Sequence, residues 1–161
     1  MYCAVLCNGS SRSLFVNPDQ YNYIIGCNIP WTKVNSTVII DVGVLDKWNN
    51  PCDFYTSVNA WREFRLRERF KDHLIEIFEP MKEFDTTGHV ATRKVISMGA
   101  TKIDIYGCDS WFTDNTDSYT HQWVDSRAID MSKQVSVWRQ RWNDIISSNP
   151  DVSINFIGDH K

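Results

Sequence analysis

Polar clusters follow several apolar runs of this chain, and their residue types suit the binding of an anionic ligand. Asn8, Gly9 and Ser10 come after the first run, Asn28 after the second, and Asp109 after a later one. Turn N–H groups with hydroxyl or amide side chains can hold phosphate oxygens, and Asn can also contact a base or a ribose. Neither the P-loop pattern nor the G-x-G-x-x-G pattern is present. Composition alone therefore also allows ordinary turns capped by Asn and Ser.

A further candidate lies at Thr86-Thr87-Gly88, which open a predicted helix. The first N–H groups of a helix have no partner within that helix, and they attract anions. Thr87 and Gly88 are therefore candidates for holding a phosphate.

A general base, if the chain has one, is most simply a histidine. His121 lies in a polar and aromatic stretch over 108–125, between Tyr119 and Trp123. Imidazole titrates near neutral pH and is the usual side chain for taking a proton in catalysis. Long segments of this composition are often lids or binding loops, so 108–125 is predicted to be a short lid. His89 begins a predicted helix and is expected to face either a ligand or solvent.

The segment 61–71 is rich in arginine with aromatic residues between the charges. Such a segment can bind a polyanion, but the favoured interpretation is an amphipathic helix whose arginine face is solvated and supported by Glu63 and Arg67 at i,i+4 spacing. The chain as a whole has a net charge of −3. This composition lacks the basic excess of a dedicated nucleic-acid-binding domain.

The elements that must position these residues alternate between short strands and helices. Strands are predicted where runs are short and rich in β-branched or aromatic residues: 2–7, 21–27, 37–42, 72–79, 102–107 and 152–157. Helices are predicted from capping residues and 3.6-residue periodicity: 58–70 with Ser57 as N-cap, 89–98 ending at Gly99, and 126–148 ending before Pro150.

This alternation predicts a single α/β domain with an open, mainly parallel, Rossmann-like sheet flanked by helices. The run 2–7 contains no charged residue, so it is expected to lie centrally, with Asn8 at its carboxyl end. In open parallel sheets, ligands bind beyond the carboxyl ends of the strands. The polar clusters above are therefore expected to meet at one edge.

Length and composition agree with one intracellular domain. The chain has 161 residues, of which 42% are hydrophobic, and this is enough for a substantial core. No run approaches the roughly 18 apolar residues of a transmembrane helix. The apolar start at 2–7 has neither the basic residues nor the cleavage site of a signal peptide. The five cysteines cannot all pair within one chain, so a cytoplasmic location with free thiols is expected.

Taken in order, the clusters resemble the motifs of bacterial sialyltransferases, which transfer sialic acid from a cytidine monophosphate (CMP) donor to surface glycans. That family opens with a strand followed by Gly-Asn-Gly-Pro-Ser-Leu, where this chain has Cys7-Asn8-Gly9-Ser10-Ser11-Arg12-Ser13-Leu14. The family's second strand ends in Arg-Cys-Asn, and here the residues are Gly26-Cys27-Asn28. A Thr-Ser-Gly helix start then corresponds to Thr86-Thr87-Gly88.

The resemblance continues to the end of the chain. The family's Leu-Gly-Tyr and Gly-x-Asp motifs correspond to Met98-Gly99-Ala100 and Gly107-Cys108-Asp109. An aromatic loop, a histidine, a long helix and a last strand follow in both. Three positions depart from the pattern: Cys7 and Ser10 replace a glycine and a proline, and Trp111 stands roughly where the family has a tyrosine. The chain is also much shorter than a typical member.

The resemblance implies an inverting, metal-independent glycosyltransferase that uses a CMP-sugar donor and an acceptor hydroxyl. His121 would be the base that deprotonates the acceptor, and Tyr119 would steady the departing phosphate. The nucleotide would be bound by residues at the strand ends and the helix start: Asn8, Gly9, Ser10, Asn28, Thr87, Gly88 and Asp109. No cofactor or metal ion is expected, and a homo-oligomer is compatible with the sequence.

Three other functions stay open. A protein that only captures a nucleotide or nucleotide-sugar would keep the binding residues and would not need His121. A pterin pyrophosphokinase-like enzyme would use Mg²⁺ held by Asp41, Asp46 and Asp109. A structural or assembly protein would use the same fold and its aromatic surface without a ligand.

Overall fold

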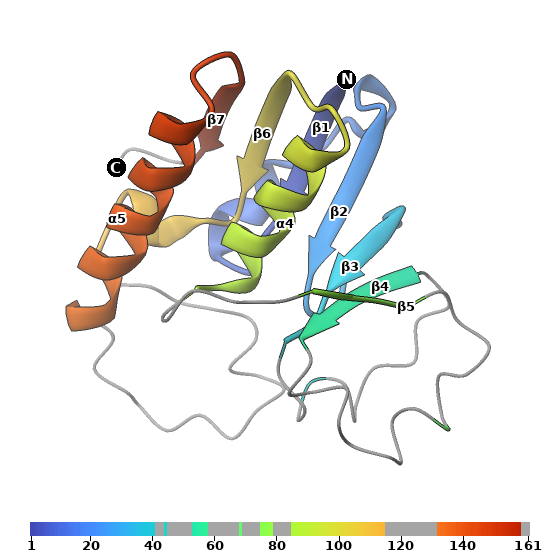
Figure 1. Cartoon of the computed structure of the whole chain (residues 1–161), viewed down its shortest axis with the longest axis horizontal. Coiled ribbons are helices and arrows are strands. Elements are labelled where there is room, and N and C mark those ends of the chain that lie inside the picture. The colour runs from blue at the N-terminus through green and yellow to red at the C-terminus, as the bar shows by residue number, and fades with distance from the viewer. Residues whose placement is uncertain are drawn as a thin grey trace.

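The computed structural model describes residues 1–40, 44, 53–57, 68, 75–78, 85–114 and 132–158. Within them, seven strands form one parallel sheet in the order β5-β4-β3-β2-β1-β6-β7 (Figure 1). The strands are β1 (Tyr2–Leu6), β2 (Tyr23–Cys27), β3 (Ser36–Val38), β4 (Asp53–Ser57), β5 (Ile75–Phe78), β6 (Lys102–Tyr106) and β7 (Ser153–Ile157). The predicted open α/β sheet is confirmed, and its central strand order is that of a Rossmann-like fold.

The helices α4 (Thr87–Ser97) and α5 (Ser132–Ser148) cover one face of this sheet. Both begin at the edge toward which the strand arrows point, which is the carboxyl edge (Figure 1). Three short 3₁₀ turns complete the described elements: η1 (Ser10–Leu14), η2 (Pro18–Gln20) and η3 (Asp109–Trp111). None of the helices in these described ranges is long and apolar enough to cross a membrane.

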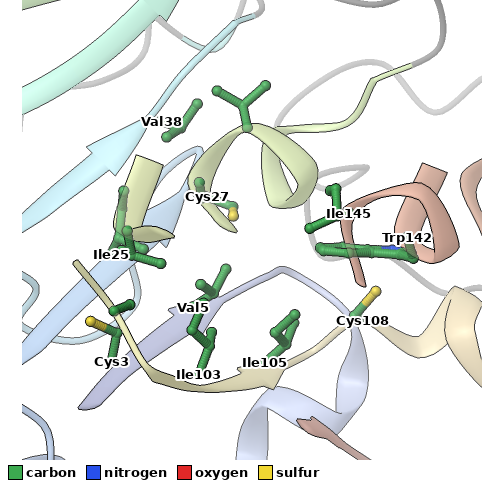
Figure 2. Close-up of a cluster of buried hydrophobic side chains, with 14 residues drawn as sticks. Cys3, Val5, Ile25, Cys27, Val38, Ile103, Ile105, Cys108, Trp142 and Ile145 are labelled. Atoms are coloured by element: carbon green, nitrogen blue, oxygen red, sulfur yellow. The ribbon is translucent and has the colours of Figure 1, made fainter. Parts of the chain in front are cut away.

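Strand β1 lies inside the sheet, between β2 and β6, as its apolar sequence predicted. Its residues alternate between two packed faces. Cys3 and Val5 join the core beneath the helices (Figure 2), whereas Ala4 and Leu6 pack with Phe15 on the other face. Because both faces are covered, the strand is a continuous apolar run without polar alternation.

The core beneath the helices is built from β-branched side chains of the strands and from one face of each helix. Trp142 and Ile145 of α5 reach the sheet beside Ile105 and Cys108 (Figure 2). Val135, Trp142 and Ile145 are buried, so the predicted apolar stripe of the last helix is confirmed in the part that is described. Residues 126–131 of that predicted helix lie outside the described residues.

The opposite face carries a buried polar network around Asp104. Its carboxylate accepts hydrogen bonds from the Tyr2 hydroxyl, from the Tyr21 hydroxyl at 2.9 Å and from Asn155 Nδ2 at 3.0 Å. The hydroxyls of Tyr21 and Tyr106 are also 2.6 Å apart. A buried carboxylate is tolerated when several donors satisfy it. This network joins β1, β6 and β7 on the face opposite α4 and α5.

Two details of the predicted elements differ from the structure. Ser57 was predicted to cap a helix, but it is the last residue of β4, a strand that the sequence analysis did not predict. The predicted helix over 58–70 and the arginine-rich segment lie outside the described residues, apart from Glu68, which is helical. Helix α4 begins at Thr87, two residues earlier than predicted, and ends at Ser97. The predicted terminating glycine, Gly99, follows the C-cap Met98 with a φ of 95°, which suits a glycine at the C′ position.

Candidate ligand-binding site

The carboxyl edge of the sheet has a point where the strand order changes direction. From β1 the sheet grows through β2 to β5 on one side, and through β6 and β7 on the other. Ligands of open α/β sheets bind at such a point. The segments after β1, β2 and β6 and the start of α4 all meet at this edge, so the predicted binding residues in the described part of the chain are gathered there.

The residues after β1 are tied to those after β2 and β6 by hydrogen bonds. Asn8 is buried, and its Nδ2 donates to the carbonyl oxygen of Cys27 at 3.0 Å. The backbone N–H of Gly9 donates to the carbonyl oxygen of Gly107 at 2.8 Å. The Asn8 side chain thus links the carboxyl end of β1 to that of β2, in addition to any contact with a ligand.

Ser10, Ser11 and Asp109 form a serine–Asp109 cluster between the β1 and β6 loops. The Ser10 hydroxyl donates to Asp109 Oδ2 at 2.8 Å, and the Ser11 N–H donates to Oδ1 at 3.2 Å. The Ser11 hydroxyl also bonds to this carboxylate, and the Gly107 N–H lies 3.1 Å from Ser11 Oγ. The sequence analysis placed Ser10 and Asp109 separately around a nucleotide, whereas in the structure they bind each other.

Asn28 occupies the left-handed region of the backbone, with φ of 60°. Its N–H donates to the carbonyl oxygen of Val38 at 2.8 Å, and the Thr37 hydroxyl donates to its carbonyl oxygen at 2.7 Å. Asn is one of the few residues that adopt this conformation readily. The turn therefore explains part of the choice of Asn at this position, and the half-buried side chain remains at the edge where a ligand would lie.

The start of α4 is shaped by a capping box between Thr86 and His89. The Thr86 side chain accepts from the His89 N–H, and the Thr86 N–H donates to His89 Nδ1 at 2.9 Å. Gly88 is buried here, and a Cβ at this position would lie 2.8 Å from Cys7 Sγ. Glycine thus lets the helix start approach the end of β1 closely, which brings Thr87 and Gly88 to the candidate site.

His89 is a buried structural residue and does not face a ligand or solvent as expected. Its Nε2 lies 3.1 Å from the carbonyl oxygen of Trp138, and its ring packs on Trp142 at a centroid distance of 4.3 Å. Because Nδ1 accepts a hydrogen bond from the Thr86 N–H, the ring proton is on Nε2, which donates a hydrogen bond to the Trp138 carbonyl oxygen. Burial lowers the pKa of His89 from 6.5 to about 4, so the ring is neutral at physiological pH.

This pKa predicts a dependence of stability on pH. The unfolded chain protonates His89 below pH 6.5, whereas the folded chain does so only near pH 4. The contribution of His89 to the free energy of unfolding is therefore fully present above pH 6.5. It falls by about 3 kcal/mol in total as the pH is lowered from 6.5 to 4. Urea unfolding of the wild type and of His89→Gln, measured between pH 4.5 and 7, should differ in slope.

Gln is the matched replacement, since it is an ordinary partner in a capping box and does not titrate. Carboxylates titrate in the same way in both proteins, so their effect on the pH dependence of unfolding cancels when the two slopes are compared. Equal slopes for the two proteins would contradict the assignment of a buried neutral His89.

Three cysteine thiols also converge at the carboxyl edge. Cys7 Sγ lies 3.9 Å from Cys27 Sγ, and Cys108 is buried in the same core. The neighbouring Cys7 thiol and burial raise the pKa of Cys108 well above its usual value. The pKa of Cys7 is raised well above its usual value as well, so the thiols of Cys7 and Cys108 are protonated at neutral pH and are poor nucleophiles. Within the described ranges, no group of three or more His, Cys, Asp or Glu residues could hold a metal ion.

The two residues predicted to be catalytic, His121 and Tyr119, lie outside the described residues, as do Asp41 and Asp46. Ser11 belongs to the polar cluster after the first strand but was not among the residues predicted to bind the nucleotide, although it supplies two of the donors to Asp109. The sequence did show two consecutive serines after Gly9, and these supply two hydroxyl donors where a turn with one serine supplies one.

Comparisons of this chain with protein-family models, with curated proteins and with solved structures found no match.

Proposed function

We propose that the carboxyl edge binds a nucleotide or nucleotide-sugar, with its phosphate near the start of α4 and its base or ribose near Asn28. The observation that carries this proposal is the convergence of a capped helix start with the ends of β1 and β2. Thr87 and Gly88 follow the cap, and the first N–H groups of a helix favour an anion. Asn28 supplies amide groups that can contact a base edge.

The finer proposal is metal-independent transfer of a sugar from a CMP-sugar donor. His121 would take the proton of the acceptor hydroxyl, that oxygen would attack the anomeric carbon, and CMP would leave with the electrons of the broken bond. Tyr119 would donate a hydrogen bond to the leaving phosphate. This proposal is supported by the resemblance in motif order, in which His121 follows an aromatic segment and precedes the last long helix.

Chain topology also supports this proposal. Segment 115–131, which carries Tyr119 and His121, follows η3 and precedes α5. Residue 114 comes shortly after the carboxyl end of β6, and α5 begins at the same edge of the sheet (Figure 1). The described residues on either side of this segment therefore lie toward the carboxyl edge, the edge at which the nucleotide is proposed to bind.

Calorimetry with CMP, AMP and GMP, each with and without Mg²⁺, tests the nucleotide proposal. We expect CMP to bind most tightly, and Mg²⁺ to be unnecessary. Asn28→Gly should weaken CMP binding by about 1–3 kcal/mol, the scale of a lost buried polar contact. Glycine is chosen because it keeps the positive φ of Asn28 while removing the side chain.

The matched control is Asn22→Gly. Asn22 precedes the amino end of the same strand, where it accepts a hydrogen bond from the Tyr2 N–H at 2.8 Å, so its loss should leave CMP affinity unchanged. Equal weak binding of all three nucleotides would count against the proposal, and strict Mg²⁺ dependence would favour a carboxylate-based site instead.

A further inference from the structure

The β1 loop has the features of an anion-binding loop, but the protein's own carboxylate occupies it. Asp109 accepts hydrogen bonds from two hydroxyls and one backbone N–H, all from Ser10 and Ser11. Hydroxyls and a backbone N–H that converge on one anion are what a loop offers to a phosphate oxygen. No cationic side chain in the described part of the chain forms an ion pair with Asp109, so these donors are its main support there.

The backbone is shaped to admit this carboxylate. A Cβ on Gly9 would lie 2.5 Å from Asp109 Oδ2 and 2.5 Å from the Gly107 carbonyl oxygen. Gly107 has φ of 70°, and a Cβ there would lie 2.6 Å from the Cys7 carbonyl oxygen. Two glycines thus allow the β1 and β6 loops to approach each other until Asp109 reaches the serines, and a side chain at either position would prevent this contact.

We infer that Asp109 is a specificity-determining residue that closes the β1 loop to ligand phosphates. Its carboxylate takes up the donors that a phosphate would use, and its charge repels a second anion at the same place. Phosphates commonly bind at the β1 loop of Rossmann-like folds. If the carboxyl edge binds a nucleotide, as proposed above, Asp109 excludes the nucleotide's phosphate from this loop. A ligand must therefore place its phosphate elsewhere along the edge.

Removal of the carboxylate should convert the loop into a phosphate site. The probe is inorganic phosphate, and the measurement is the thermal unfolding midpoint in phosphate against chloride at equal ionic strength and pH 7. In chloride, Asp109→Ala should unfold roughly 3–10 °C below the wild type, because charge-assisted hydrogen bonds are lost. At a phosphate concentration ten times its Kd, Asp109→Ala should recover about 3–6 °C more than the wild type gains.

Two further variants give the experiment its controls. Asp144→Ala removes a carboxylate from α5 that accepts from Gln140 at 3.1 Å, and it should gain no more from phosphate than the wild type. Asp109→Ala combined with Ser11→Ala should lose the additional gain, because Ser11 supplies two of the donors. These controls separate a bound phosphate from the general stabilisation that phosphate gives to folded proteins.

Asp109→Ser keeps the inference testable if Asp109→Ala does not fold in chloride. Serine is shorter than aspartate, so it leaves space for an anion while keeping one polar group, and it should show the same additional gain. Calorimetry should then detect phosphate binding at least tenfold tighter than in the wild type. Equal gains in the wild type and both Asp109 variants would overturn the inference.

The readout uses inorganic phosphate and no nucleotide. Its failure would leave the proposed nucleotide site untouched, and a failure of CMP binding would leave the assignment of Asp109 standing.

Discussion

Replacement of Trp142 by alanine is expected to lower the free energy of unfolding by about 3–5 kcal/mol, the usual range for a fully buried aromatic side chain. Trp142 is 1% exposed. Its ring centroid lies 4.3 Å from that of His89 and 5.1 Å from that of Phe156, and it belongs to the same buried cluster as Cys108. The ring therefore joins α5 to α4 and to β7. Figure 2 shows it beside Cys108, which follows β6.

Urea unfolding followed by far-UV circular dichroism measures this loss. The matched control is Trp31→Ala, since Trp31 is 36% exposed and packs against Phe15 and Arg12 at the surface. We expect the control to lose about 1 kcal/mol or less, in the range of surface substitutions and single cation–π contacts. Similar losses for both variants would contradict the central position of Trp142 in the core.

The second large effect is expected on turnover. If the protein transfers or hydrolyses a CMP-sugar, His121→Ala should lower the rate by about 10²–10⁴-fold, the usual contribution of a general base. CMP affinity should change little, because the general base must lie beside the acceptor and not beside the nucleobase. The residues proposed to bind CMP are at the strand ends and at the start of α4. Rate assays and calorimetry on the same preparation separate the two effects.

Tyr119→Phe is the companion variant, because it removes one hydroxyl and keeps the ring. It should reduce turnover less than His121→Ala, since it removes one hydrogen bond to the leaving phosphate and leaves the base in place. Wild-type rates in His121→Ala would remove this residue from the mechanism. A wild-type protein that binds CMP and turns over no donor would favour the ligand-binding function without chemistry.

The open parallel sheet and the central place of β1 could be predicted because local sequence determines them strongly. The charge-free run 2–7 must be covered on both faces, and this places it inside a parallel sheet. The end of α4 was also predictable, since Gly99 provides the positive φ of a helix C-cap. Strand β4 was missed because Ser57, its last residue, was interpreted as the cap of a following helix.

The pairing within the site could not be predicted from the sequence. Ser11 and Asp109 are 98 residues apart, and they meet only because β1 and β6 are neighbours in register. His89 was identified at a helix start, but its burial depends on where α5 crosses α4 and presents the Trp138 carbonyl. These contacts depend on tertiary geometry, for which residue type and spacing carry no local signal.

Because β1 pairs with β6, the sheet cannot form around β1 until β6 has been synthesised. Tyr2 pairs with Lys102, so about a hundred residues must be synthesised before the N–H and C=O groups on one side of β1 can pair with β6. Closing so long a loop is entropically costly and slows folding. Until β6 leaves the ribosome, β1 is an edge strand made of apolar residues, the kind of edge to which other chains bind in aggregates. The nascent amino-terminal half therefore presents its most hydrophobic strand, unpaired on one side, to the cell's chaperones.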